Sequence, residues 1–196
     1  AALCEQLGVS RSSLREALQH LKVRGIIEST PRRGMFVRSI QPSMLEKDFS
    51  LFGQVEDDPA AFLELLELRL LIEPENARRA ASSIDSTGLR KLESVLSAMK
   101  SHLDDIDAFI EDDLEMHLLL GELSGNRYIK IIFACLKPLG CRYGKVSTHS
   151  KTFLQQTLSE HRAIVAAIRQ SNPAAAAKAM REHLEHSLHQ YQTLRN

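Results

Sequence analysis

Hydrophobic and polar positions follow a helical period along most of the chain beyond residue 59. Apolar residues recur there at helical spacing, and the apolar runs are separated by short segments such as SIDSTG, LDDID, SGN, THSK and QSNP. No strand pattern and no internal repeat interrupts this stretch. The pattern predicts six long helices, at residues 60–83, 86–101, 105–124, 126–145, 152–170 and 173–194.

A different kind of segment precedes these helices. Residues 39–58 contain Pro42, Gly53 and the acidic turn VEDDP, which are typical of a domain boundary, and a short helix is predicted at residues 43–52. The fold class that we predict is mainly α. Its expected parts are a DNA-binding domain at residues 1–40, a linker with a short helix at 41–58, and an antiparallel all-α bundle of about six to seven helices at 59–196.

The beginning of the chain has the pattern of a helix-turn-helix. The segment LCEQLGVSRSSLREALQHLKVRGII starts with the end of a helix, breaks at Gly8, and restarts after the N-cap residue Ser10 with a helix to about Val23. A helix, a short turn containing Gly and a second helix form this motif. The inward stripe predicted for the second helix consists of Leu14, Ala17, Leu18 and Leu21.

A basic hairpin follows this motif. After Gly25 the sequence predicts two short strands, at residues 26–29 and 35–38, joined by the tight turn TPRRG. Such a hairpin beside a recognition helix is a wing. Its arginines are expected to enter a minor groove or to contact phosphate.

Charge separates the two parts of the chain. The formal net charge of the whole chain is zero, but residues 1–40 contain seven basic and three acidic residues, a net charge of +4. We predict that double-stranded DNA is the partner of this basic head, and the alternative is a small helical domain with a solvated basic face. The expected DNA-binding residues are Ser10, Arg11, Ser12, Arg15, Arg32, Arg33 and Gly34.

Length and composition fit this organisation. The chain has 196 residues, 43% of them hydrophobic and 26% charged, which suits one or two globular domains with a core. Its three cysteines include no CxxC pair, which favours a reducing compartment, and no apolar run approaches the roughly 20 residues of a membrane helix. We expect a cytoplasmic protein with no membrane partner. Because the chain begins with Ala, we expect its first domain to be truncated at the N-terminus.

Four residues of the helical part form a candidate metal site. Asp113 and His117 are four positions apart, so they lie on one helix face and can share a ligand. His161 and His183 lie at matching depths of later helices. Three imidazoles and one carboxylate suit Zn²⁺ or another divalent transition metal, such as Ni²⁺ or Mn²⁺. A hydrogen bond between Asp113 and His117 is the alternative, and the sequence leaves open whether nearby His186 or His189 contributes.

Two regions of the sequence resemble known domains. Residues 3–38, with VSRSSLREAL and the wing GMFV, resemble the winged helix-turn-helix of GntR-family bacterial transcription regulators. Residues 43–193, through ELRLLIEP, DLEMHLLLGELSGN and LSEHRAIVAAIRQSNPAAAAKAMREHL, are similar to the FCD effector-binding domain of the FadR subfamily. The resemblance implies a ligand-responsive repressor, and its metal ligands, carried onto this chain, are Asp113, His117, His161 and His183.

A small carboxylate, such as an organic or sugar acid, is the effector that we expect. It would bind between the open positions of the metal and a cation, for which Arg69 is the strongest candidate and Arg142 a weaker one. An intrahelical pair between Arg69 and Glu73 is the alternative. We expect a homodimer that presents two heads to a near-palindromic operator.

Two other functions are weighed against this prediction. A metal-dependent enzyme acting on a small organic acid is one alternative, but neither His-Glu-x-x-His nor repeated Glu-x-x-His occurs, and no Gly-rich phosphate loop is present. A ligand-independent architectural module is the other. The sequence therefore favours a regulator over an enzyme.

Overall fold

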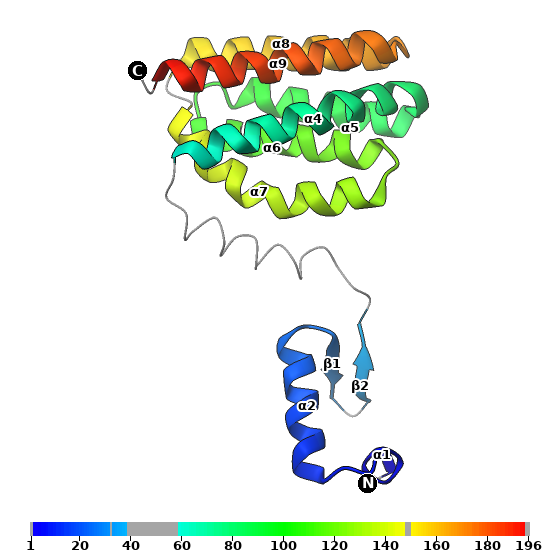
Figure 1. Cartoon of the computed structure of the whole chain (residues 1–196). Coiled ribbons are helices and arrows are strands. Elements are labelled where there is room, and N and C mark those ends of the chain that lie inside the picture. The colour runs from blue at the N-terminus through cyan, green and yellow to red at the C-terminus, as the bar shows by residue number, and fades with distance from the viewer. Residues whose placement is uncertain (1, 32, 39–58, 148–149, 195–196) are drawn as a thin grey trace. The chain divides into compact units, whose positions relative to one another are not determined.

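The computed structural model describes residues 2–31, 33–38, 59–147 and 150–194 (Figure 1). The chain divides into two compact units, residues 1–48 and 49–196, and each is described here by itself. The predicted short helix at residues 43–52 lies outside the described residues.

The N-terminal unit is a helix-turn-helix followed by a two-stranded wing. Helix α1 (Ala2–Leu7) ends before Gly8, whose φ of +64° turns the chain towards helix α2 (Arg11–Val23). The side chain of Ser10 caps α2 by accepting a hydrogen bond from the backbone N–H of Ser13 at 3.1 Å. Strands β1 (Ile27–Thr30) and β2 (Gly34–Val37) pair antiparallel, from Ile27 opposite Val37 to Thr30 opposite Gly34. The predicted fold class is confirmed for this unit, with both strands shifted by one residue.

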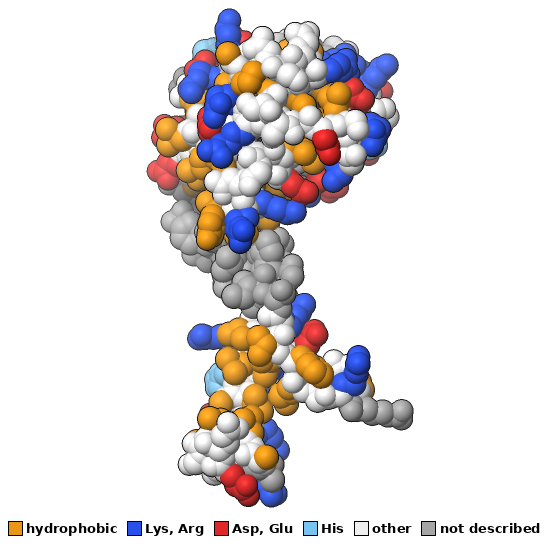
Figure 2. Space-filling model, turned by 90° about the vertical axis from the view of Figure 1, so that its right-hand side faces the viewer, with side chains coloured by type: hydrophobic (Ala, Val, Ile, Leu, Met, Phe, Trp, Pro, Cys, Tyr) orange, Lys and Arg blue, Asp and Glu red, His pale blue; other side chains and the backbone are white. Residues whose placement is uncertain are grey.

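The inward stripe predicted for α2 is only partly correct. Leu14 and Leu18 are half-buried, but Ala17 is exposed and Leu21 is 37% exposed. Within the described part of this unit Ile27 alone is buried. Figure 2 shows hydrophobic side chains gathered on its surface. Periodicity identified the apolar face of α2, but the described elements of this unit cover only half of that face.

Six helices build the described part of the second unit, and each predicted end lies within two residues of the observed one. They are α4 (Pro59–Ser83), α5 (Ser86–Ser101), α6 (Ile106–Leu123), α7 (Arg127–Ser147), α8 (Lys151–Arg169) and α9 (Pro173–Leu194). The side chains of Asp85, Asp105 and Ser150 accept backbone hydrogen bonds at the starts of α5, α6 and α8. These caps satisfy N–H groups that a helix start leaves without partners. The all-α bundle is thus confirmed.

Packing places α6 inside the bundle. Helices α8 and α9 pack together, α4 packs against α9, and α6 contacts α4, α5 and α7. In Figure 1, α8 and α9 form the upper layer of this unit, α4, α5 and α6 the middle layer, and α7 the lower layer. The core includes Leu92, Met99, Met116, Leu120, Leu154, Ile164, Ile168, Met180 and Leu184, each at most 1% exposed. No helix in the described part of the chain is long and apolar enough to cross a lipid bilayer.

Candidate metal centre

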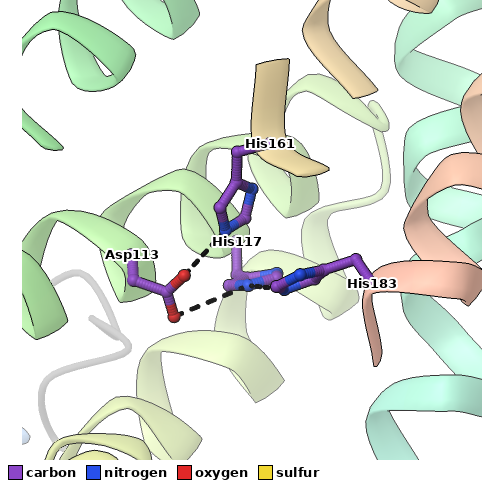
Figure 3. A group of neighbouring side chains, drawn as sticks. All are labelled: Asp113, His117, His161 and His183. Carbon is purple, nitrogen blue, oxygen red and sulfur yellow. Dashed lines mark hydrogen bonds and ion pairs between the residues drawn. The ribbon is translucent and has the colours of Figure 1, made fainter. Parts of the chain in front are cut away.

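The bundle brings the four predicted metal ligands together. Asp113 and His117 lie one turn apart on α6, and His161 from α8 and His183 from α9 point towards them (Figure 3). One ligand atom from each residue lies within 4.8 Å of all the others. The three imidazoles are at most 3% exposed, and Asp113 is partly buried. The candidate site is therefore enclosed, with its carboxylate towards the more open side.

The Nε2 atoms of all three imidazoles face the centre of this group. His161 Nε2 lies 2.7 Å from Asp113 Oδ1, His183 Nε2 lies 3.3 Å from His117 Nε2, and His117 Nε2 lies 3.8 Å from Asp113 Oδ2. Metal-ligand bonds of about 2.0 to 2.2 Å in a tetrahedron separate ligand atoms by roughly 3.3 to 3.6 Å. The observed separations bracket that range, so these donors fit a divalent metal with small side-chain movements.

Electrostatics keep these groups in the protonation states that bind metal. Burial and the nearby charge of Arg69 lower the pKa of His117 to about 4, and burial also lowers the pKa of His183. Burial alone would raise the pKa of Asp113, but the hydrogen bond from His161 and the neighbouring imidazoles lower it below its ordinary value. Metal ligands must be unprotonated imidazoles and ionised carboxylates. Near neutral pH, His117, His183 and Asp113 meet this requirement.

Two glutamates contact His117 and His183 through the ring nitrogens that face away from the centre of the group. The sequence did not predict this role for either glutamate. Glu73 on α4 accepts a hydrogen bond from His117 Nδ1, and Glu160 on α8 accepts one from His183 Nδ1 at 2.9 Å. Each glutamate is far along the chain from its partner histidine, so no local spacing could have indicated the pair. Such carboxylates fix the ring orientation of metal-binding histidines.

The two histidines left open by the sequence lie outside the ligand group. His186 Nδ1 lies 2.9 Å from Glu160 Oε1, and His189 is exposed on α9. Among the described residues, the cluster of possible metal ligands contains neither of them.

Arg69 contacts Glu73 and also borders a cavity. Its Nε donates to Glu73 Oε1 at 2.5 Å, so the intrahelical pair considered from the sequence is present. Its Nη2 is nevertheless buried and has no hydrogen-bond partner among the described residues. Arg69, Asp113 and His183 line a cavity of about 60 Å³, together with Thr157, whose buried hydroxyl also has no such partner. Buried donors without partners are costly, which indicates a place for a polar ligand.

The structure describes several of the other predicted site residues in full, one in part and one not at all. Arg142 lies in α7, but its side chain is outside the described part of the chain, and Arg32 is outside it altogether. In the N-terminal unit, Arg11, Ser12 and Arg15 are exposed in the first turns of α2. The remaining wing residues, Arg33 and Gly34, are also exposed, and Gly34 has a φ of +95°.

The outer face of α2 carries polar and basic side chains. Ser12 and Arg15 border an open hollow with Glu16, Gln19 and His20. Arginine, serine and glutamine side chains reach base edges or phosphates when such a helix enters the major groove. Ser10 differs from its neighbours because its hydroxyl caps the helix.

Comparisons with known proteins match both units. The family described as "Bacterial regulatory proteins, gntR family" matches residues 1–37, and the one described as "FCD domain" matches residues 64–186. The galactonate operon transcriptional repressor of Escherichia coli (strain K12) is 31% identical over 182 residues, which are 91% of this chain and 80% of that protein.

Further relatives agree with this match. The HTH-type transcriptional regulator LutR of Bacillus subtilis (strain 168) is 30% identical over 190 residues, which are 93% of this chain and 85% of that protein. Among solved structures, Streptococcus agalactiae GntR is 27% identical and aligns over 96% of this chain and 86% of that one, with a TM-score of 0.71.

Proposed function

Because the chain belongs to the GntR family of bacterial regulatory proteins and carries an FCD domain, we propose that it is a repressor controlled by a metal-bound carboxylate. The family and the relatives are DNA-binding transcription regulators, and the chain is accordingly a regulator and not an enzyme. The metal, which we take to be Zn²⁺ from its donor set, and the chemical class of the effector are the parts that we add.

One observation carries the proposal. The buried Nη2 of Arg69 lacks a hydrogen-bond partner among the described residues, and Arg69 lines the same cavity as Asp113 and His183, two members of the ligand group. Burial alone would lower the pKa of Arg69, but Glu73 beside it raises the pKa above its ordinary value, so the guanidinium is charged. An arginine of this kind is suited to bind a carboxylate.

Each part of the cavity has a separate task. The ligand group would hold the metal through His117, His161, His183 and Asp113. A divalent metal that accepts a fifth or sixth ligand beside these four would supply a Lewis-acidic centre to the oxygens of the effector. Arg69 would pair with the carboxylate of the effector, and the hydroxyl of Thr157 would donate a hydrogen bond to one of the effector's oxygens.

The name of one relative supports a hydroxylated acid as the effector. One relative is named as the repressor of a galactonate operon, and galactonate is a small polyhydroxylated carboxylate. For this chain we propose the wider class of small organic and sugar acids. The heads of a homodimer would then bind two half-sites of a near-palindromic operator.

The test combines metal content with operator binding. We expect about one metal ion per chain by mass spectrometry of the purified protein. An operator would be selected from random DNA, and its affinity would be measured by fluorescence anisotropy with a panel of acids that includes galactonate and lactate. One acid should change the affinity about 5- to 150-fold, which is the usual range of coupling between two sites. Chelation should abolish that response. A protein without bound metal, or a response that survives chelation, would contradict the proposal.

A further inference from the structure

Glu73 uses its two carboxylate oxygens for two different partners. Oε2 accepts a hydrogen bond from His117 Nδ1, and Oε1 accepts one from Arg69 Nε. The side chain of Glu73 is 1% exposed, so these contacts and not water satisfy it. One buried carboxylate on α4 thus contacts both a member of the ligand group and the arginine of the cavity.

The contact with His117 determines which ring nitrogen carries the proton. A neutral imidazole has one N–H, and an ionised carboxylate can only accept, so the proton lies on Nδ1. The lone pair of Nε2 then faces the centre of the ligand group, where Nε2 lies 3.3 Å from His183 Nε2. Without this acceptor, the proton is free to occupy Nε2 and block its use as a ligand.

The contact with Arg69 determines where the guanidinium points. Because Nε is held by Glu73 and the group is planar, the direction of Nη2 is fixed, and Arg69 lines the cavity shared with Asp113. The exposed fraction of the Arg69 side chain is 13%, so few other orientations are available.

We propose that Glu73 is a positioning residue that holds the metal ligand His117 and the anion-binding Arg69 in register with each other. The inference rests on the proposed function and deepens it, because it makes metal binding and effector binding depend on one carboxylate. Glu160 provides the contrast. It contacts His183 of the ligand group, and also His186, but it does not contact Arg69.

The substitution Glu73→Gln tests both contacts with almost no change in shape. Glutamine has one carbonyl oxygen, so it can accept from either Arg69 or His117 but not from both. If the oxygen accepts from His117, the amide nitrogen faces the Nε–H of Arg69, which loses its acceptor. If the oxygen accepts from Arg69, the amide nitrogen donates to His117 Nδ1, and the ring proton moves to Nε2. We expect the affinity for Zn²⁺, measured by competition with a chromophoric chelator, to fall about 10- to 100-fold. Glu75→Gln is the matched control, because Glu75 lies on the same helix, is 42% exposed and pairs with Arg78 and Arg79.

Nitrogen NMR of the metal-free protein gives a second measurement that needs no ligand. In the unsubstituted chain we expect His117 to be protonated at Nδ1, and the Nε–H signal of Arg69 to be that of a strong hydrogen bond. Both signals should change in Glu73→Gln, whereas Glu160→Gln should lower Zn²⁺ affinity and leave the Arg69 signal unchanged.

The outcomes separate this inference from the proposed function. A His117 ring protonated at Nε2 in the unsubstituted chain would overturn the positioning role even if Glu73→Gln fails to fold. An unchanged Zn²⁺ affinity in folded Glu73→Gln would overturn it too. If the unsubstituted chain binds no Zn²⁺, the proposed metal site fails, and the NMR signals of His117 and Arg69 alone decide whether Glu73 positions them.

Discussion

The two units of this chain bury very different sets of residues. In the described part of the N-terminal unit Ile27 alone is buried, whereas the helical unit encloses a continuous core contributed by five of its helices. That core surrounds the buried polar side chains Glu73, Asn76, His117, Ser124, Thr157, His161 and His183. Burying polar groups is costly unless they have partners. The contrast indicates that the head works through its surface, and that the helical unit works through polar groups in its interior.

Among the substitutions that test this contrast, loss of a buried histidine of the ligand group should have the largest effect. His161 is fully buried, and its Nε2 faces the centre of the ligand group. We predict that His161→Ala lowers Zn²⁺ affinity by more than 100-fold, beyond the roughly 10- to 100-fold cost of losing an outer carboxylate. Metal content by mass spectrometry and chelator competition are the measurements.

The control for this substitution lies on α9. His189 is exposed and is not a member of the ligand group, so His189→Ala should retain the metal. Full metal retention in His161→Ala would remove His161 from the site. Operator affinity of the metal-free protein should be equal in both variants, because both substitutions lie outside the N-terminal unit.

Loss of a surface arginine in the N-terminal unit should have a smaller effect than loss of His161. It should lower operator affinity and leave Zn²⁺ affinity unchanged. Arg15 is exposed on α2 and borders the hollow with Gln19. If it pairs with a base or phosphate, Arg15→Ala should cost about 1 to 3 kcal/mol of operator binding, or about 5- to 150-fold in affinity. Zn²⁺ affinity should not change. Anisotropy titrations against the selected operator measure the effect.

A matched substitution in the helical unit sharpens this comparison. Arg162 is exposed on α8, so Arg162→Ala removes a surface arginine from the unit that is not expected to contact DNA. Equal operator affinity of Arg15→Ala and the unsubstituted chain would remove Arg15 from the DNA-binding surface. An equal loss in both variants would instead indicate a general effect of charge.

Local patterns in the sequence were sufficient to predict the helices of the bundle. Periodicity acts over a few positions, and the separating segments SIDSTG and THSK contain Asp85 and Ser150, the residues that cap α5 and α8. Asp113 and His117 were likewise recognisable because they are one helical turn apart. The other two candidate ligands, His161 and His183, are assigned to the same site by the resemblance to a family, since spacing along the chain does not connect them with Asp113 and His117.

Contacts between distant segments were beyond such patterns. Glu73 and His117 are 44 residues apart, and nothing in the sequence pairs them. The same limit explains the error on α2. Periodicity placed Ala17 and Leu21 on the apolar face, but whether that face is covered depends on other segments. The sequence therefore predicted the four residues that lie together in the bundle but not the carboxylates that contact them.

The smallest predicted effect concerns Ser10, which was expected to contact DNA and which caps α2. Its hydroxyl accepts the N–H of Ser13 at 3.1 Å, so Ser10→Ala should destabilise the start of α2 by about 1 kcal/mol. Hydrogen exchange of the first amides of α2 should become about five-fold faster, with operator affinity reduced by a similar factor and Zn²⁺ affinity unchanged.

Ser12→Ala compares capping with DNA contact, because the Ser12 hydroxyl lies 2.8 Å from that of Ser10 but is not the acceptor that caps α2. If the main role of Ser10 is to order the recognition helix, exchange at the start of α2 should accelerate more in Ser10→Ala than in Ser12→Ala. A loss of operator affinity in Ser10→Ala with unchanged exchange would instead make Ser10 a direct contact. With one buried residue in the described part of this unit, we expect the amides of α2 to open locally and exchange without global unfolding, which makes this small difference measurable.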